Sequence, residues 1–350
     1  MASDPFSKML GVAAGAFDRA FAAAIQARGR RDRAEADKMP HAERLAKLAA
    51  VASLYSDAAH AEFFPRPRHV DLTLRDVRPG VAEAHWRSAF EPYVSAVADR
   101  YLSHVENRTA RARLYLGAGK RRAAVIAIHG YMGGAWLLEE NTWPIEWLQR
   151  RGLDVALPVL PFHAGRGGLR SGAPKFPSAD PRMTNEGFRQ AVADVRTLVR
   201  WLRDRGAPHV GVMGMSLGGY TTSLVATVVE EGEIDFVMPM IPLASIADFA
   251  REQGRLGLGA EADEQHAALE RANWVASPLA RPLRIPKTRA LVVAAENDRI
   301  TPVTHAERIA KHFDCELRTV GGAHLIQIGR GDAFRALAAM LERDGILARR

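Results

Sequence analysis

The 350-residue sequence contains a single cysteine, Cys315. One cysteine excludes an internal disulfide bond and any metal cluster built on cysteine ligands. Because Cys315 falls inside a predicted strand, we expect it to be a small buried apolar side chain. Histidine offers little support for metal binding either, because different predicted elements carry His60, His69 and His85 without ligand spacing. No metal site is predicted.

Long apolar runs are scarce as well. The longest uncharged run, residues 207–229, has the length of a membrane span, but its Gly, Ser and Thr content argues against that role. The apolar stretch 9–17 ends at Asp18 and Arg19 before a convincing cleavage site, so we expect a helix there rather than a signal peptide. The expected location is the cytoplasm.

The formal net charge of +8 is unevenly distributed. Residues 1–122 hold 21 Lys and Arg against 14 Asp and Glu, whereas the remaining residues hold 27 against 26. Such a basic segment can bind nucleic acid or acidic lipid. Its charges are mixed, as in RGRRDRAEADK (28–38), and no nucleic-acid module or aromatic platform accompanies them. A solvated face is the better interpretation, and no nucleic-acid partner is expected.

Apolar residues recur at three- and four-residue intervals over the first 27 residues, which predicts an amphipathic helix. Most helices of this kind pack on their own protein. Weak contact with a membrane surface is the alternative, because Lys8, Arg19 and the basic cluster 28–33 can face lipid headgroups.

Strand and helix patterns alternate over most of the chain. A second helix is predicted over His41–Tyr55, and Thr184 is the expected N-cap of a longer one. The predicted strands are 69–77, 81–90, 109–116, 123–130, 153–161, 209–214, 236–244, 291–297 and 315–322, and the later helices are 143–152, 184–206, 223–231, 304–313 and one from Ala333. This order predicts an α/β fold with a mainly parallel central sheet and helices on both faces.

A glycine-rich turn interrupts this pattern. In GVMGMSLGGY (211–220), Ser216 lies between Gly214 and Gly218 in the frame G-x-S-x-G. An apolar strand pattern precedes Ser216 and a helix pattern follows it. A serine nucleophile requires this context, because a sharp strand-to-helix turn exposes its hydroxyl and admits only small neighbours. We interpret Ser216 as a nucleophile, with a structural turn serine as the alternative.

A serine hydroxyl needs a base to accept its proton and a carboxylate to orient that base. In a parallel α/β sheet such groups follow the carboxyl ends of strands. Asp298 follows the strand 291–297, and His324 follows the strand 315–322. The sequence therefore predicts a triad of Ser216, Asp298 and His324.

Acyl transfer also requires donors for the negative charge of the tetrahedral intermediate. The backbone N–H of Leu217, directly after the serine, is one expected donor. The loop HGYMGG (129–134) follows an early central strand, and its glycines allow close approach of the backbone. We expect the N–H of Tyr131 to be the second donor. This mechanism needs no cofactor.

Together, these motifs resemble the α/β-hydrolase superfamily, in particular its esterase and lipase-like members. The resemblance covers roughly residues 109–350 and rests on HGYMGG, GMSLGG, the aspartate in ENDRITP and the histidine in GGAH. It implies an α/β-hydrolase domain over residues 66–350 after an N-terminal helical extension over residues 1–65. It also implies a small helical lid at 245–286, in which the best helix pattern covers 262–274.

The resemblance also decides between candidate acids. Glu296 and Asp248 compete with Asp298, but the residues after Asp298 match the superfamily pattern. We therefore prefer Asp298.

Several other residues near these motifs have structural interpretations. We expect His129 to support its turn and expect packing roles for Met213 and Met215. His163 and Arg166 fall in a long Pro- and Gly-rich loop, where solvation is expected and a substrate-facing position is the alternative.

The sequence thus predicts a serine carboxylic-ester hydrolase that acts on a small-molecule or lipid ester through an acyl-enzyme. One alternative is a membrane-associated acyl-lipid hydrolase that docks through the N-terminal helix. Another is a non-catalytic protein that keeps the scaffold alone. A peptidase or thioesterase uses the same apparatus, and the oligomeric state stays open.

Overall fold

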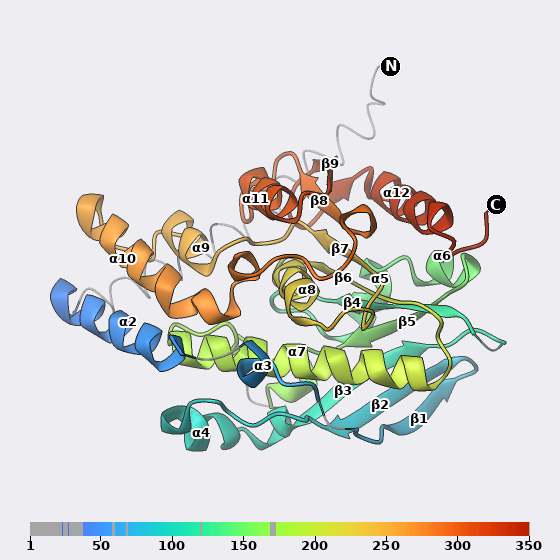
Figure 1. Ribbon diagram of the computed structural model, residues 1–350, viewed down its shortest axis with the longest axis horizontal. Coiled ribbons are helices and arrows are strands. Elements are labelled where there is room, and N and C mark those ends of the chain that lie inside the picture. Colours follow the sequence, from blue (N-terminus) through green and yellow to red (C-terminus); the bar gives the residue numbers. More distant parts are fainter. Residues whose placement is uncertain are drawn as a thin grey trace.

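The computed structural model describes residues 23, 27, 38–57, 60–67, 69–119, 121–168 and 173–349. Within these residues, ten strands form one sheet in the order β1-β2-β3-β5-β4-β6-β7-β8-β9-β10 (Figure 1). The strands are β1 (Thr73–Arg78), β2 (Val81–Arg87), β3 (Thr109–Tyr115), β4 (Ala123–Ile128), β5 (Leu153–Pro158), β6 (Val210–Met215), β7 (Phe236–Met240), β8 (Leu291–Ala295), β9 (Glu316–Gly322) and β10 (Gln327–Ile328).

The centre of the sheet is parallel and its flanks are antiparallel. Parallel pairing runs from β5 through β4, β6, β7 and β8 to β9. Strands β1, β2 and β3 add antiparallel at one end, and β10 adds antiparallel at the other. The side chains of β4 alternate between two cores: Ile126 and Ile128 enter one, and Val125 and Ala127 enter the other. Burial on both faces explains the continuous apolar runs of the parallel strands.

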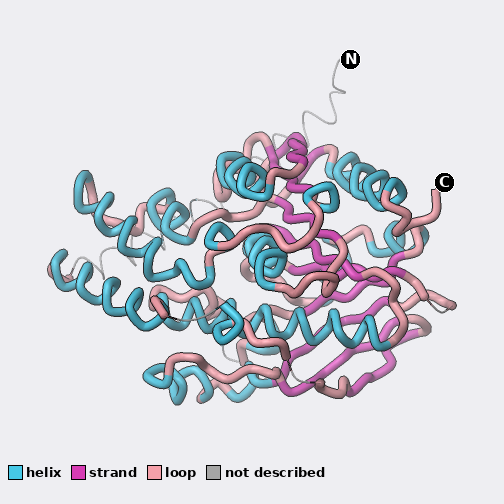
Figure 2. Tube along the Cα trace, viewed as in Figure 1, coloured by secondary structure: helices cyan, strands magenta, loops and turns pink. Residues whose placement is uncertain are grey.

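Helices cover both faces of this sheet (Figure 2). Apolar side chains of α7, α8 and α11 join one core, and those of α6 and α12 join the other. The helices are α2 (His41–Tyr55), α3 (His60–Phe63), α4 (Ser95–Leu102), α5 (Trp136–Thr142), α6 (Ile145–Arg150), α7 (Pro181–Asp204), α8 (Leu217–Val228), α9 (Ile246–Glu252), α10 (Gly259–Asn273), α11 (Val303–Phe313) and α12 (Arg330–Arg343). The predicted fold class is confirmed.

Most predicted elements agree with the structure, but the start of α7 was predicted wrongly. The helix begins at Pro181 instead of Thr184, and its N-cap is Asp180, whose side chain accepts from the N–H of Arg182 at 3.1 Å. Proline in the first turn suits a helix start because its missing N–H would have no helical partner there. The pattern also missed α4 and α5, which are too short to show a helical period.

Cys315 corrects another expectation, because it lies directly before β9 and is partly exposed. Its backbone N–H donates to the carbonyl oxygen of Ala310 at 3.1 Å, after Asp314 has taken the left-handed conformation (φ 49°). This is the hydrogen bonding of a helix C-terminus. Cys315 therefore closes α11 and does not belong to the strand.

The N-terminal helix expected over the first 27 residues falls outside the described residues except at Ala23 and Ala27, so membrane contact through it stays a prediction. Among the helices that the structure describes, none combines the length and the apolar character needed to cross a bilayer.

Helix α2 packs against α10 of the predicted lid segment. His41 lies 2.9 Å from Glu264, and the Arg44 guanidinium donates to the Arg255 carbonyl oxygen at 3.1 Å. Tyr55, the last residue of α2, is buried in the core. The helix thus lies against the hydrolase-like core, and the proposed boundary at residue 65 stays a prediction.

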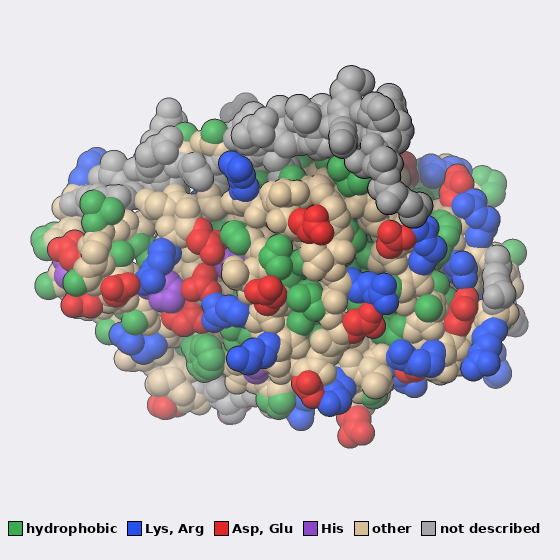
Figure 3. Space-filling view, turned by 90° about the horizontal axis from the view of Figure 1, so that it is seen from above, with side chains coloured by type: hydrophobic (Ala, Val, Ile, Leu, Met, Phe, Trp, Pro, Cys, Tyr) green, Lys and Arg blue, Asp and Glu red, His purple; other side chains and the backbone are tan. Residues whose placement is uncertain are grey.

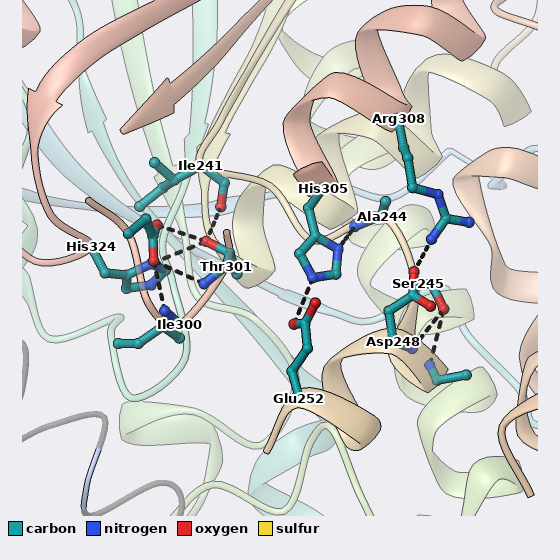
Figure 4. Close-up of polar contacts among 12 residues, drawn as sticks. Ile241, Ala244, Ser245, Asp248, Glu252, Ile300, Thr301, His305, Arg308 and His324 are labelled. Atoms are coloured by element: carbon teal, nitrogen blue, oxygen red, sulfur yellow. Dashed lines mark hydrogen bonds and ion pairs between the residues drawn. The ribbon is translucent and has the colours of Figure 1, made fainter. Parts of the chain in front are cut away.

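The segment 245–286 contains α9 and α10, so the helical character predicted for the lid is observed. Charged contacts attach α9 to α11: Glu252 accepts from His305 Nε2 at 2.9 Å, and Asp248 pairs with Arg308 (Figure 4). His305 Nδ1 accepts the N–H of Ala244 at 3.0 Å, which fixes the Nε2–H tautomer that Glu252 needs.

A buried polar network holds the loop between β5 and α7. Arg166 donates to Asp194 on α7 and to the Val159 carbonyl oxygen, both at 2.8 Å, and Asp194 also accepts from Ser88 at 2.6 Å. Burial raises the pKa of Asp194, and the Arg166 guanidinium opposes this shift. Arg166 and His163 are both buried, so the expectation that they are solvated was wrong. The loop needs these polar contacts because its backbone runs through the interior.

Replacing Arg166 with Met should lower the free energy of unfolding by about 3–5 kcal/mol, because Asp194 would keep a buried charge without a partner. Urea denaturation measures the change. The control is Arg335→Ala, which removes an exposed ion pair with Asp332 and should change stability by less than about 1 kcal/mol. Equal losses in the two variants would contradict a structural role for the buried pair.

Candidate active site

Ser216 forms the sharp turn between β6 and α8. Its backbone has φ 55° and ψ −114°, a conformation that costs a non-glycine residue about 1–3 kcal/mol. The turn is tight: a Cβ on Gly218 would lie 2.1 Å from the Ile128 carbonyl oxygen, and one on Gly214 would lie 2.3 Å from the Gly218 carbonyl oxygen. The strand-turn-helix context predicted for Ser216 is therefore present, and the absent side chains make it sterically feasible.

The structure brings Ser216, Asp298 and His324 together. His324 Nε2 lies 3.0 Å from Ser216 Oγ, and His324 Nδ1 lies 2.7 Å from Asp298 Oδ2. All three residues are buried. Because an Nδ1–H directed at the carboxylate leaves Nε2 unprotonated, the imidazole can accept the serine proton.

Four hydrogen bonds hold the Asp298 carboxylate. Oδ1 accepts the backbone N–H groups of Ile300 and Thr301, each at 2.8 Å, and Oδ2 accepts from Thr301 Oγ1 at 2.8 Å and from His324. Such bonds favour the charged form of a buried carboxylate and fix its orientation.

Thr301 was missed as a site residue in the sequence analysis. Its hydroxyl oxygen lies 3.1 Å from His324 Nδ1 and 3.1 Å from the Ile241 carbonyl oxygen, in addition to its contact with Asp298 (Figure 4). It thus links the acid, the histidine and the end of β7. Its position within the ENDRITP segment was the available signal.

The competing acids lie elsewhere. Glu296 is exposed to solvent. Asp248 is occupied on the lid, where it accepts from His266 at 2.7 Å and pairs with Arg308. The structure thus places Asp298, and neither competitor, in contact with His324.

The predicted oxyanion donors line the same cavity as Ser216. A Cβ on Gly130 would lie 3.5 Å from the Ser216 Cβ, so the loop carrying Tyr131 passes beside the serine. Leu217 is the first residue of α8, where backbone N–H groups lack helical partners. Both Tyr131 and Leu217 belong to the cavity wall.

His129 has the structural role expected for it. Its Nδ1–H donates to the Gly130 carbonyl oxygen at 2.7 Å, and its Nε2 accepts the N–H of Leu160 at 2.9 Å. Burial lowers the pKa of His129, and burial lowers the pKa of the neighbouring His163 to about 3. Both rings are therefore neutral near pH 7.

The two methionines of the serine motif differ in position. Met213 is fully buried in the core, as expected. Met215 is only partly buried and borders the cavity, so its role is not confined to packing.

Ser216 and His324 open into a cavity of about 1680 Å³. Its walls include α2, the lid helices α9 and α10, and residues 174–184. Typical small-ligand sites have volumes of about 300–1,000 Å³, so this cavity has room for a long or bulky substrate. Exposed apolar side chains also line it: Leu54, Met132, Leu138, Leu325 and Ile326.

Charged groups elsewhere are mostly paired or solvated. On the part of the surface that Figure 3 draws in colour, acidic and basic side chains are interspersed. His69 contacts Asp71 at 3.2 Å. Within the described residues, no group of three or more His, Cys, Asp or Glu side chains is arranged to hold a metal ion.

Comparison with known proteins places the motifs in context. Residues 203–336, which include Ser216, Asp298 and His324, match the family model described as serine hydrolase. The protein Rv2627c of Mycobacterium tuberculosis (strain H37Rv) is 30% identical over 285 residues, which cover 78% of this chain and 67% of that protein.

Two solved esterases share the fold at low identity. Acetyl xylan esterase 1 from Thermoanaerobacterium sp. JW/SL YS485 is 15% identical with a TM-score of 0.53, and the match covers 84% of this chain and 92% of that one. The acetyl xylan esterase from Paenibacillus sp. R4 is 12% identical with a TM-score of 0.52, and the match covers 86% and 99%.

Replacing Gly218 with Ala should lower the free energy of unfolding by about 1–3 kcal/mol or more, because the new methyl group would press against backbone oxygens that cannot move freely. The matched control is Gly331→Ala on α12, where the nearest atom is the flexible end of Arg335 at 3.4 Å. Chemical denaturation compares the two. Similar stability in both variants would show that the Ser216 turn tolerates a side chain.

Proposed function

Because this chain belongs to the α/β-hydrolase superfamily and to the same family as Rv2627c, we propose that it is a serine hydrolase that cleaves carboxylic esters through an acyl-enzyme. The observation that carries the proposal is the position of His324, whose two ring nitrogens lie within hydrogen-bond distance of Ser216 and Asp298. This arrangement meets the geometric requirement for a hydroxyl nucleophile, its base and an orienting acid.

In the first half-reaction, Ser216 Oγ attacks the carbonyl carbon of the ester while His324 Nε2 takes the hydroxyl proton. Asp298 stabilises the imidazolium that forms. The N–H groups of Tyr131 and Leu217 receive the oxyanion. The intermediate then collapses, the carbon–oxygen bond to the alcohol breaks, and His324 returns the proton to the leaving oxygen.

In the second half-reaction, water attacks the acyl carbon and gives a proton to His324 Nε2. The bond from the acyl carbon to Ser216 Oγ breaks, and the histidine returns the proton to the serine. Free acid leaves, and the resting side chains are restored. These steps are completed by groups of this chain and water.

The cavity favours an acyl-lipid hydrolase as a second candidate. Its volume of about 1680 Å³ and the exposed Leu54, Met132 and Leu325 suit a long acyl chain. A preference for long-chain over short-chain p-nitrophenyl esters would support this candidate, and a preference for acetyl esters would argue against it. Thioesters and amides use the same apparatus.

Replacing Ser216 with Ala should lower kcat/KM for p-nitrophenyl butyrate by about 10⁴-fold or more, because the variant lacks the nucleophile. A fluorophosphonate probe should label the wild-type chain at Ser216 and should not label the variant. Wild-type turnover in the variant would reject the assignment. A folded wild-type chain that neither turns over esters nor reacts with the probe would instead favour a non-catalytic scaffold.

Replacing Thr301 with Val should lower kcat by about tenfold with little change in KM, because a side chain without a hydroxyl cannot hold Asp298 and His324 in register. Thr301→Ser keeps the hydroxyl and should recover most of the activity. Steady-state kinetics and thermal melts of both variants test this. A loss that follows melting temperature, and not the hydroxyl, would indicate a packing role.

A further inference from the structure

Arg330 lies in the cavity wall at the start of α12. Its Nη1 is 3.8 Å from the sulfur of Met215, the residue directly before Ser216. Its Nη2 donates to the Thr142 carbonyl oxygen, and its guanidinium carbon lies 5.8 Å from the ring centre of Phe334. These contacts hold a cation beside the strand end from which the serine projects.

None of these contacts neutralises the charge of Arg330. Within the described part of the chain, no carboxylate forms an ion pair with it. Two other cations of the cavity, Arg100 and Arg182, differ in this respect, because both pair with Asp180, at 3.2 and 2.9 Å. Burial lowers the pKa of Arg330, and no neighbouring acid opposes that shift.

A half-buried cation without a counter-ion is unfavourable, and a bound anion would relieve the cost. A guanidinium group suits carboxylate and phosphate because its planar N–H fork binds two oxygens at once. A structural link from α12 to α5 is the competing explanation, since Arg330 donates to Thr142. That link uses only one nitrogen and needs no charge.

We propose that the ester substrate carries an anionic group, a carboxylate or a phosphate, which pairs with Arg330 while its carbonyl carbon lies at Ser216. The inference rests on the proposed ester hydrolysis and narrows its substrate class. Apolar side chains share this part of the cavity wall, including Met132, Leu138 and Ile326. The wall therefore suits an amphiphilic ester with a charged end near the reacting carbonyl.

The test compares esters that differ in charge. On the acyl side, p-nitrophenyl hemisuccinate is matched with p-nitrophenyl butyrate. On the alcohol side, 4-butyryloxybenzoate and 4-butyryloxyphenyl phosphate are matched with methyl 4-butyryloxybenzoate, so that the two anions are distinguished. The measured quantity is the ratio of kcat/KM for each anionic ester to that of its neutral match.

In the wild-type chain, at least one anionic ester should be preferred over its neutral match. Arg330→Gln should lower that ratio by about 10- to 100-fold, as expected for the loss of a charge-assisted pair. Arg330→Lys keeps the charge without the fork and should lower the ratio less. The control, Arg182→Gln, removes a cavity cation that Asp180 already neutralises, and should change the ratio by less than about threefold.

The outcomes separate the inference from the proposed function. Ester hydrolysis with equal ratios in the wild-type and Arg330→Gln chains would overturn the inference alone and would leave a structural role for Arg330. The same holds for anionic and neutral rates that fall together with melting temperature. Hydrolysis of every ester by Ser216→Ala at the wild-type rate would overturn the proposed function itself.

Discussion

The backbone turn at Ser216 is the constraint on which the site depends. A serine in this conformation is strained, and it persists because the surrounding structure leaves the chain no other path. The N–H of Ser216 donates to the Met240 carbonyl oxygen at 3.0 Å, and all of α8 behind it is buried. The free energy gained by burying this helix is therefore available to hold the hydroxyl in a position that isolated chain would avoid.

Strand ends explain how much of the site could be predicted from the sequence. Ser216, Asp298 and His324 each follow an apolar strand pattern, and parallel strands bring their carboxyl ends to one edge of the sheet. Local pattern and chain order were therefore enough to identify them. Thr301 and Arg330 could not be identified this way, because their importance comes from contacts with residues far away in the sequence.

The same limit explains the errors about burial. Arg166 lies in a loop whose composition predicts solvation, yet its partner Asp194 is 28 residues later, on α7. Composition describes a segment alone, whereas the burial of a charge is decided by what packs around it. The lid shows the related case of charged residues that fasten helices: α11 begins two residues after Thr301 and also receives Glu252 of α9 through His305. One helix thus connects the support of the acid to the attachment of the lid.

The contact between α2 and α10 has a consequence for how specificity can diverge in this family. The cavity is enclosed by one helix from near the start of the chain and another from an insertion more than 200 residues later. Neither helix supplies Ser216, Asp298 or His324. Changes in the length or sequence of these two helices can therefore reshape the chamber, from a closed pocket to an open trough, while the reacting groups stay in place.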